Sequence, residues 1–158
     1  MAYLTVVERM AKLLATTNKM VERVQFTASK ERTPTILIVD DEALIRMTVS
    51  DFLQECGFKV LEASNAAEAI EVIQSCRITI DLVFSDVRMP GELDGFGLST
   101  WIKKNRPELP VILTSGDAKT SDTALAICSE VHFLPKPFDL QMALAHIRQE
   151  IERRKKEP

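Results

Sequence analysis

Short apolar runs alternate with segments of helical spacing from residue 34 to the end of the chain. The first run, Ile36–Val39, is continuously apolar, which is typical of a strand buried on both faces. Four more strands are predicted, over residues 58–61, 78–85, 110–114 and 131–134. Helices are predicted over residues 43–56, 66–75 and about 121–128. One further helix is predicted to end at residue 105, and a last one to begin after residue 139. Strict alternation predicts an α/β fold with a doubly wound, five-stranded parallel sheet, because parallel neighbours need crossover helices.

Three ends of the predicted helices carry residues that suit a cap. Gly57 follows the first helix and suits the position where a left-handed backbone ends a helix. Asn65 and Glu68 are spaced as a capping pair for the helix over 66–75. Asp139 is the predicted cap of the last helix, whose apolar positions Leu140, Leu144, Ile147 and Ile151 share one face.

The first 30 residues form a separate segment, divided from the rest by the polar stretch 29–33 and Pro34. Apolar residues recur there with spacings of three and four, at Tyr3, Val7, Met10, Leu14, Val21 and Val24, with Thr17 in the same series. Val6, Leu13 and Met20 widen the stripe beyond a two-stranded coiled coil. We expect an amphipathic helix that forms a homodimer, with docking onto its own domain as the alternative.

The chain has 158 residues, of which 46% are hydrophobic and 27% charged, a composition typical of a soluble globular protein. Residues 33–151 carry a net charge of −8, which argues against a nucleic-acid partner. The basic tail over 153–158 is interpreted as the solvated end of a helix rather than a contact to DNA or membrane. No apolar run approaches the roughly 20 residues of a membrane span. Three cysteines without a CxxC pair favour a reducing, cytoplasmic location over a zinc or disulfide framework.

Polar residues that could carry chemistry follow four of the predicted strands. Asp40 and Asp41 end the first strand, Asp86 the third and Ser115 the fourth, and Lys136 follows the fifth. Parallel sheets bind ligands beyond the carboxyl ends of their strands, so we expect these side chains to converge. Three carboxylates would repel one another, and Mg²⁺ together with a lysine would neutralise them. Such a site suits phosphoryl transfer to an aspartate. Taken singly, the Asp pair could instead cap a helix, and Lys136 could be a solvated charge.

Five segments in this order resemble the receiver domain of bacterial two-component response regulators. They are residues 36–46 (ILIVDDEALIR), 81–90 (DLVFSDVRMP), 94–95 (DG), 110–116 (PVILTSG) and 133–138 (FLPKPF). The resemblance covers about residues 34–152 and implies a flavodoxin-like (βα)5 fold. It implies that Asp86 is the phospho-acceptor and that Asp41 binds Mg²⁺ directly, with Asp40 acting through water and the carbonyl of Arg88 as a further ligand.

The resemblance also implies a switch beside the acceptor. Ser115 matches the switch hydroxyl, although Thr114 leaves some choice, and Phe133 matches the switch aromatic, with a plain core aromatic as the alternative. Lys136 matches the conserved-type lysine, and the Lys136–Pro137 peptide is expected to be cis. We further hypothesise that Arg88 and Asp117 pair across the mouth of the site and tune the lifetime of the phosphoryl group.

The function expected from the resemblance is signalling rather than enzymatic turnover. A stand-alone receiver would take phosphate from a histidine kinase or phosphotransfer protein and then dock to a downstream protein target. Alternatives are a segment of a hybrid histidine kinase, a pseudo-receiver, and an aspartyl-nucleophile phosphohydrolase, which would place a second Asp where Arg88 stands. His132 and His146 are interpreted as surface or partly buried imidazoles with satisfied hydrogen bonds, not as phosphotransfer residues.

Overall fold

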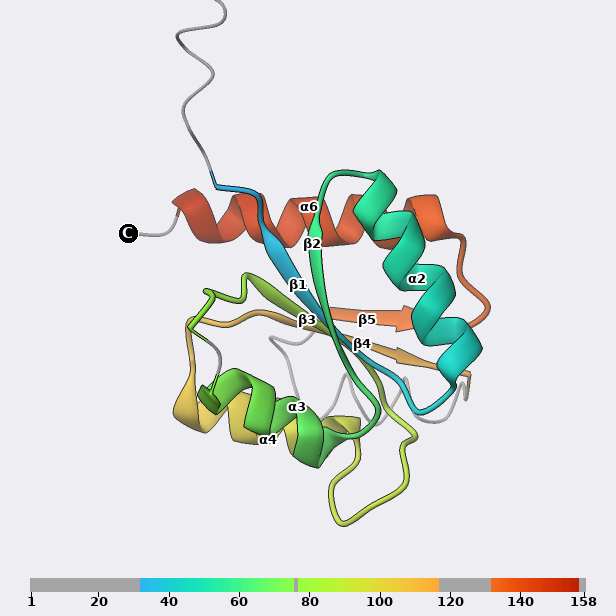
Figure 1. The fold of residues 1–158 in the computed structure, drawn as a ribbon, viewed down its shortest axis with the longest axis vertical. Helices are drawn as coiled ribbons and strands as arrows, with labels where there is room; N and C mark the ends of the chain where they lie inside the picture. The colour runs from blue at the N-terminus through green and yellow to red at the C-terminus, as the bar shows by residue number, and fades with distance from the viewer. Residues whose placement is uncertain (1–31, 76, 117–131, 157–158) are drawn as a thin grey trace, which may run out of the picture. The chain divides into compact units, whose positions relative to one another are not determined.

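The computed structural model describes residues 32–75, 77–116 and 132–156. Its centre is a sheet of five parallel strands in the order β2-β1-β3-β4-β5 (Figure 1). The strands are β1 (Thr35–Val39), β2 (Lys59–Ala63), β3 (Leu82–Asp86), β4 (Val111–Ser115) and β5 (His132–Pro135). The helices are α2 (Ala43–Glu55), α3 (Ala66–Ser75), α4 (Gly95–Asn105) and α6 (Leu140–Lys156). The predicted fold class is thereby confirmed, whereas the predicted helices over 1–30 and about 121–128, and Asp117, lie outside the described residues.

The two faces of the sheet carry separate hydrophobic layers. Alternate strand residues point to opposite faces, so Ile36 and Ile38 face α2 and α6, whereas Leu37 and Val39 face α3 and α4. The central strands β1, β3 and β4 are buried along their whole length, as continuous apolar runs predict. The described helices include none long and apolar enough to span a bilayer.

The predicted caps are present. Gly57 has a φ of +90°, the left-handed backbone that glycine adopts without a Cβ clash. Asn65 Oδ1 accepts from the backbone N of Glu68 at 2.9 Å, but the Glu68 carboxylate reaches back to Ser64 rather than to Asn65, accepting from both its N and its Oγ at 2.7 Å. These hydrogen bonds from Ser64 lower the pKa of Glu68. Asp139 Oδ1 accepts from the backbone N of Gln141 at 2.6 Å.

Two strand boundaries differ from prediction by two residues or more, and the others described differ by at most one. β3 begins at Leu82 and not at residue 78, because the Asp81 carboxylate accepts the backbone N of Thr35 at 2.8 Å and Ile78 is exposed. β2 extends to Ala63 because all five of its residues pair with β1, including the charged Glu62 opposite Ile38. Tertiary pairing therefore decided both ends.

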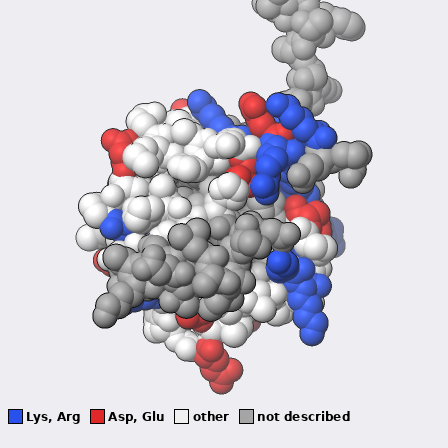
Figure 2. All heavy atoms as spheres, turned by 180° about the vertical axis from the view of Figure 1, so that it is seen from behind, with Lys and Arg blue, Asp and Glu red and all other residues white. Residues whose placement is uncertain are grey.

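The basic residues near the C-terminus belong to α6, which continues to Lys156. Arg153, Arg154, Lys155 and Lys156 form its last turn, where cations favour the helix dipole. Figure 2 shows Lys and Arg side chains gathered at its upper right, where α6 ends. The sequence interpretation of these residues as a helix end agrees with this placement.

Candidate functional site

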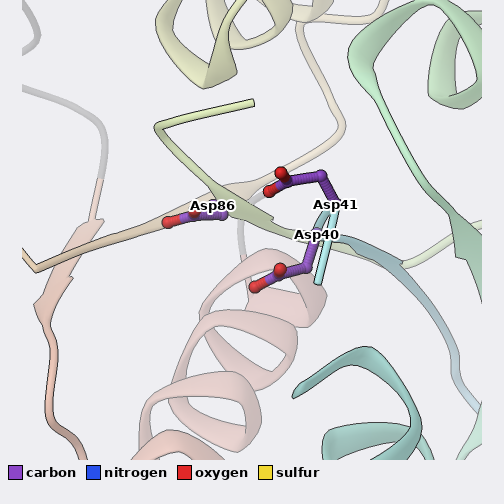
Figure 3. Close-up of side chains that lie close together, drawn as sticks. All are labelled: Asp40, Asp41 and Asp86. Carbon is purple, nitrogen blue, oxygen red and sulfur yellow. The ribbon is translucent and has the colours of Figure 1, made fainter. Parts of the chain in front are cut away.

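The three predicted carboxylates meet at the carboxyl edge of the sheet. Asp40 and Asp41 follow β1, Asp86 ends β3, and these two strands are neighbours. One oxygen from each carboxylate lies within 4.8 Å of the others (Figure 3). Asp40 and Asp86 are 4% and 8% exposed, whereas Asp41 is open to solvent. The expected convergence is therefore observed.

Lys136 brings a positive charge to the cluster from two strands away. Its Nζ lies 3.2 Å from Asp40 Oδ2 and 3.2 Å from Asp86 Oδ1. Its backbone N donates to the carbonyl of Ser115 at 2.8 Å, which ties the residue to the end of β4. The Lys136–Pro137 peptide is cis, as expected.

The charges of this cluster do not cancel. Burial raises the pKa of Asp86, the negative charge of Asp40 raises it further, and Lys136 opposes both effects. Burial acts to lower the pKa of Lys136, but Asp86 and Asp40 outweigh it and the pKa is raised, so the ammonium stays charged. One ammonium thus contacts two carboxylates of a cluster of three. The donors are all oxygen atoms, at least one of them solvent-accessible, and this is the ligand set that Mg²⁺ prefers.

Backbone contacts fix the acidic pair. Asp40 Oδ1 accepts from the backbone N of Glu42 at 2.9 Å, and Arg46 Nη1 donates to the main-chain oxygen of Asp40 at 2.6 Å. Arg46 in turn pairs with Glu62, its Nε 3.1 Å from Oε2. Arg46 was noticed in the sequence only as part of a motif, and nothing in its local pattern indicated this contact.

Gly95 is a second residue whose place in the site was not anticipated. It begins α4, and its N donates to the carbonyl of Val87 at 2.8 Å. A Cβ at this position would lie 2.3 Å from the carbonyl oxygen of Asp86 and 2.7 Å from Val87 Cα. Only glycine lets α4 approach the backbone of Asp86 so closely.

The remaining predicted residues lie around this centre. Ser115 ends β4 and is buried, while the Thr114 hydroxyl lies 3.5 Å from the carbonyl of Ser85, a long hydrogen bond. The assignment of Ser115 rather than Thr114 as the switch hydroxyl stays a prediction. Phe133 is partly buried and packs on the α3/α4 layer, and Arg88 is exposed. Asp117, its predicted partner, lies outside the described residues. His132 pairs with the buried Glu150, its Nε2 2.7 Å from Oε1.

Comparison with known proteins identifies the family. Residues 36–148 match the family model described as the response regulator receiver domain. The chain is 35% identical over 120 residues to the sensor kinase CckA of Brucella abortus, and 36% identical over 118 residues to the transcriptional regulator NtrC of Escherichia coli K12. These matches cover 75% and 73% of this chain but only 13% and 24% of the two relatives.

Solved structures give the same result. A receiver domain protein from Clostridium thermocellum matches with a TM-score of 0.71 and 31% identity, over 77% of this chain and 97% of that one. The receiver domain of the hybrid histidine kinase CckA matches with a TM-score of 0.62 and 33% identity, over 74% of this chain and 98% of that one. This chain belongs to the response regulator receiver family of two-component signalling systems, a family of signalling modules.

Proposed function

We propose that this receiver accepts a phosphoryl group on Asp86 from a histidine kinase or phosphotransfer protein, in a reaction that requires Mg²⁺. The observation that carries the proposal is that the Asp86 carboxylate shares the Lys136 ammonium with Asp40, at 3.2 Å from each, and has an oxygen within 4.8 Å of oxygens of both Asp40 and Asp41. An aspartate beside two cations, here Mg²⁺ and the Lys136 ammonium, can act as a nucleophile toward phosphorus.

The residues of the cluster divide into metal ligands and phosphoryl-binding groups. Asp41, which is exposed, would bind the metal directly together with Asp86 and the carbonyl of Arg88, while Asp40 would act largely through water. When bound, Mg²⁺ would offset negative charge on the phosphoryl oxygens. Lys136 would bind one of those oxygens, since its Nζ already lies 3.2 Å from Asp86 Oδ1.

The transfer balances as a displacement at phosphorus. A carboxylate oxygen of Asp86 forms the new P–O bond as the P–N bond of a phosphohistidine breaks, and the histidine nitrogen keeps the electron pair. The hydroxyl of Ser115, at the end of the adjacent β4, would then donate a hydrogen bond to a phosphoryl oxygen. Positioning and electrostatics would supply most of the rate.

The outcome of phosphorylation would be a changed protein-binding surface. A phosphoryl group adds a charge of about −1.5 to −2 at the sheet edge. Attraction of Ser115 toward it would alter the packing of the neighbouring β5, where Phe133 is only partly buried. Moving such an equilibrium almost completely requires about 5.5 kcal/mol of differential stabilisation, within reach of several charge-assisted hydrogen bonds. The downstream partner in this proposal is a protein.

Two exposed apolar side chains lie on the first turns of α2. Leu44 is 80% exposed and Met47 is 55% exposed, and both follow the acidic pair within six residues of the sequence. Exposed apolar side chains that form a contiguous patch mark protein contact sites. Their position favours a protein as the phosphodonor. This holds whether the chain acts as a stand-alone receiver or as the receiver segment of a hybrid kinase.

The test is incubation with a small phosphodonor and Mg²⁺, followed by intact mass measurement. The wild type should gain the mass of one acid-labile phosphoryl group, and Asp86→Asn should gain none. Asp94→Asn is the matched control. Asp94 lies in the segment between β3 and α4 and caps α4 by accepting from the N of Gly97 at 2.8 Å, and asparagine caps equally well. A wild type that stays unmodified would support a pseudo-receiver, and catalytic consumption of the donor would support a phosphohydrolase.

A further inference from the structure

Arg46, in the first turn of α2, connects three elements at the edge of the site. Its Nη1 donates to the main-chain oxygen of Asp40 at 2.6 Å, and its Nε lies 3.1 Å from Glu62 Oε2 on β2. The side chain is only 17% exposed. A guanidinium presents its donors in a rigid plane, so an arginine held at two points restrains the atoms it contacts.

The atom that Arg46 contacts belongs to the peptide that carries the acidic pair. The carbonyl oxygen of Asp40 and the nitrogen of Asp41 are parts of one planar peptide unit. The orientation of that plane helps set the directions of both side chains. On its other side the turn is held by Asp40 N, which donates to the carbonyl of Ala63 at 3.2 Å, and by Asp40 Oδ1, which accepts from Glu42 N.

We propose that Arg46 is a positioning residue for the metal site. It would hold the Asp40–Asp41 peptide in the orientation that directs both carboxylates toward Asp86, and Glu62 would hold Arg46. This inference rests on the proposed Mg²⁺-dependent function. Arg46 would touch neither the metal nor the phosphoryl group, and it would act through the Asp40 carbonyl.

The sign of the effect separates positioning from simple electrostatics. Arg46 is a cation close to a site for a divalent cation, so Coulomb repulsion alone predicts that a neutral residue at 46 would strengthen Mg²⁺ binding. Positioning predicts the opposite, because a misdirected carboxylate pair binds the ion less well. Loss of a residue that orients metal ligands typically weakens affinity by about 10- to 100-fold.

The experiment measures Mg²⁺ affinity by titration calorimetry on the full chain, for the wild type and four variants. Arg46→Gln removes the charge, and Arg46→Lys keeps the charge but loses the forked contact to two partners. Glu62→Gln leaves Arg46 in place and neutralises its anchor. Arg106→Gln is the matched control, since Arg106 also pairs with a glutamate through Nε, 2.6 Å from Glu108 Oε1, but far along the chain from the acidic pair. Urea unfolding in the absence of Mg²⁺ is recorded for each protein.

We expect both Arg46 variants to bind Mg²⁺ at least about 10-fold more weakly than the wild type, with Glu62→Gln weakened less and Arg106→Gln unchanged. Unchanged or tighter binding by Arg46→Gln would overturn the inference, as would a loss of stability without any loss of affinity. If Arg46→Gln fails to fold, Arg46→Lys and Glu62→Gln still decide, because unaltered affinity in both would overturn it too. A wild type that binds no Mg²⁺ would instead refute the proposed function itself.

Discussion

Replacing Gly95 by alanine should destabilise the domain although alanine is the better helix former. The new Cβ would lie 2.3 Å from the Asp86 carbonyl oxygen and 2.7 Å from Val87 Cα, whereas ordinary contacts begin near 3.4 Å. Both neighbours are backbone atoms of the segment that leaves β3, so no side chain can rotate away. The start of α4 must therefore retreat by about 1 Å.

The cost has two parts. Overpacking of this kind typically costs about 1–3 kcal/mol. The retreat also strains the hydrogen bond from Gly95 N to the Val87 carbonyl, now 2.8 Å, and losing it would add about 0.5–1.5 kcal/mol. Against this, alanine in a helix gains about 0.5–1 kcal/mol over glycine. We expect a net loss of about 0.5–4 kcal/mol from a total stability that is typically 5–15 kcal/mol.

Gly97, two residues along α4, is the control. A Cβ there would meet Leu93 Cδ2 at 2.8 Å, but this atom is the end of a flexible side chain that is 38% exposed. Gly97→Ala should therefore leave the free energy of unfolding unchanged or raise it by up to about 1 kcal/mol. Urea unfolding of the two variants and the wild type measures both values. Equal stability of Gly95→Ala and Gly97→Ala would show that the close backbone approach at Gly95 does not require glycine.

Three further changes test other parts of the fold. Ser50→Ala should raise the free energy of unfolding by about 0.5–1 kcal/mol in urea, since the buried Ser50 Oγ has no hydrogen-bond partner among the described residues; a decrease would show that the hydroxyl is satisfied. Asp81→Ala should lower the free energy of unfolding by about 1.5–3 kcal/mol, because the buried carboxylate accepts from Thr35 N at 2.8 Å. A loss no larger than that of the exposed cap variant Asp139→Ala would contradict this. Glu68 has a lowered pKa in the folded state, so its contribution is present above its unfolded pKa and is lost as the pH falls through the folded value. Glu68→Gln should accordingly be less stable than the wild type at pH 7, and the difference should shrink in acid. Thermal unfolding of both proteins at pH 7 and pH 3 measures this difference. A difference that is the same at both pH values would contradict the prediction.

Local pattern was sufficient for the elements whose causes are local. The strand over β1 follows from a continuous apolar run, and α3 follows from its periodicity and the Asn65–Glu68 cap. The meeting of Asp40, Asp41 and Asp86 was also predictable, since carboxyl ends of parallel strands share one edge and the three residues stand at two of those ends.

Other features depend on partners that are distant in the sequence. Glu62 reads as a break in an apolar run, yet it lies within β2 because β1 supplies its hydrogen-bond partners. The first residues predicted for β3 lie outside the strand because the Asp81 carboxylate bonds to Thr35. The contact of Arg46 with the Asp40 carbonyl and the need for glycine at position 95 both depend on atoms of other elements. The order of elements and the chemistry at their ends could thus be inferred from the sequence, because periodicity, caps and residue type act over a few residues. Strand limits, hydrogen-bond partners and close approaches could be seen only in the folded protein, because they depend on distances between segments that the chain brings together on folding.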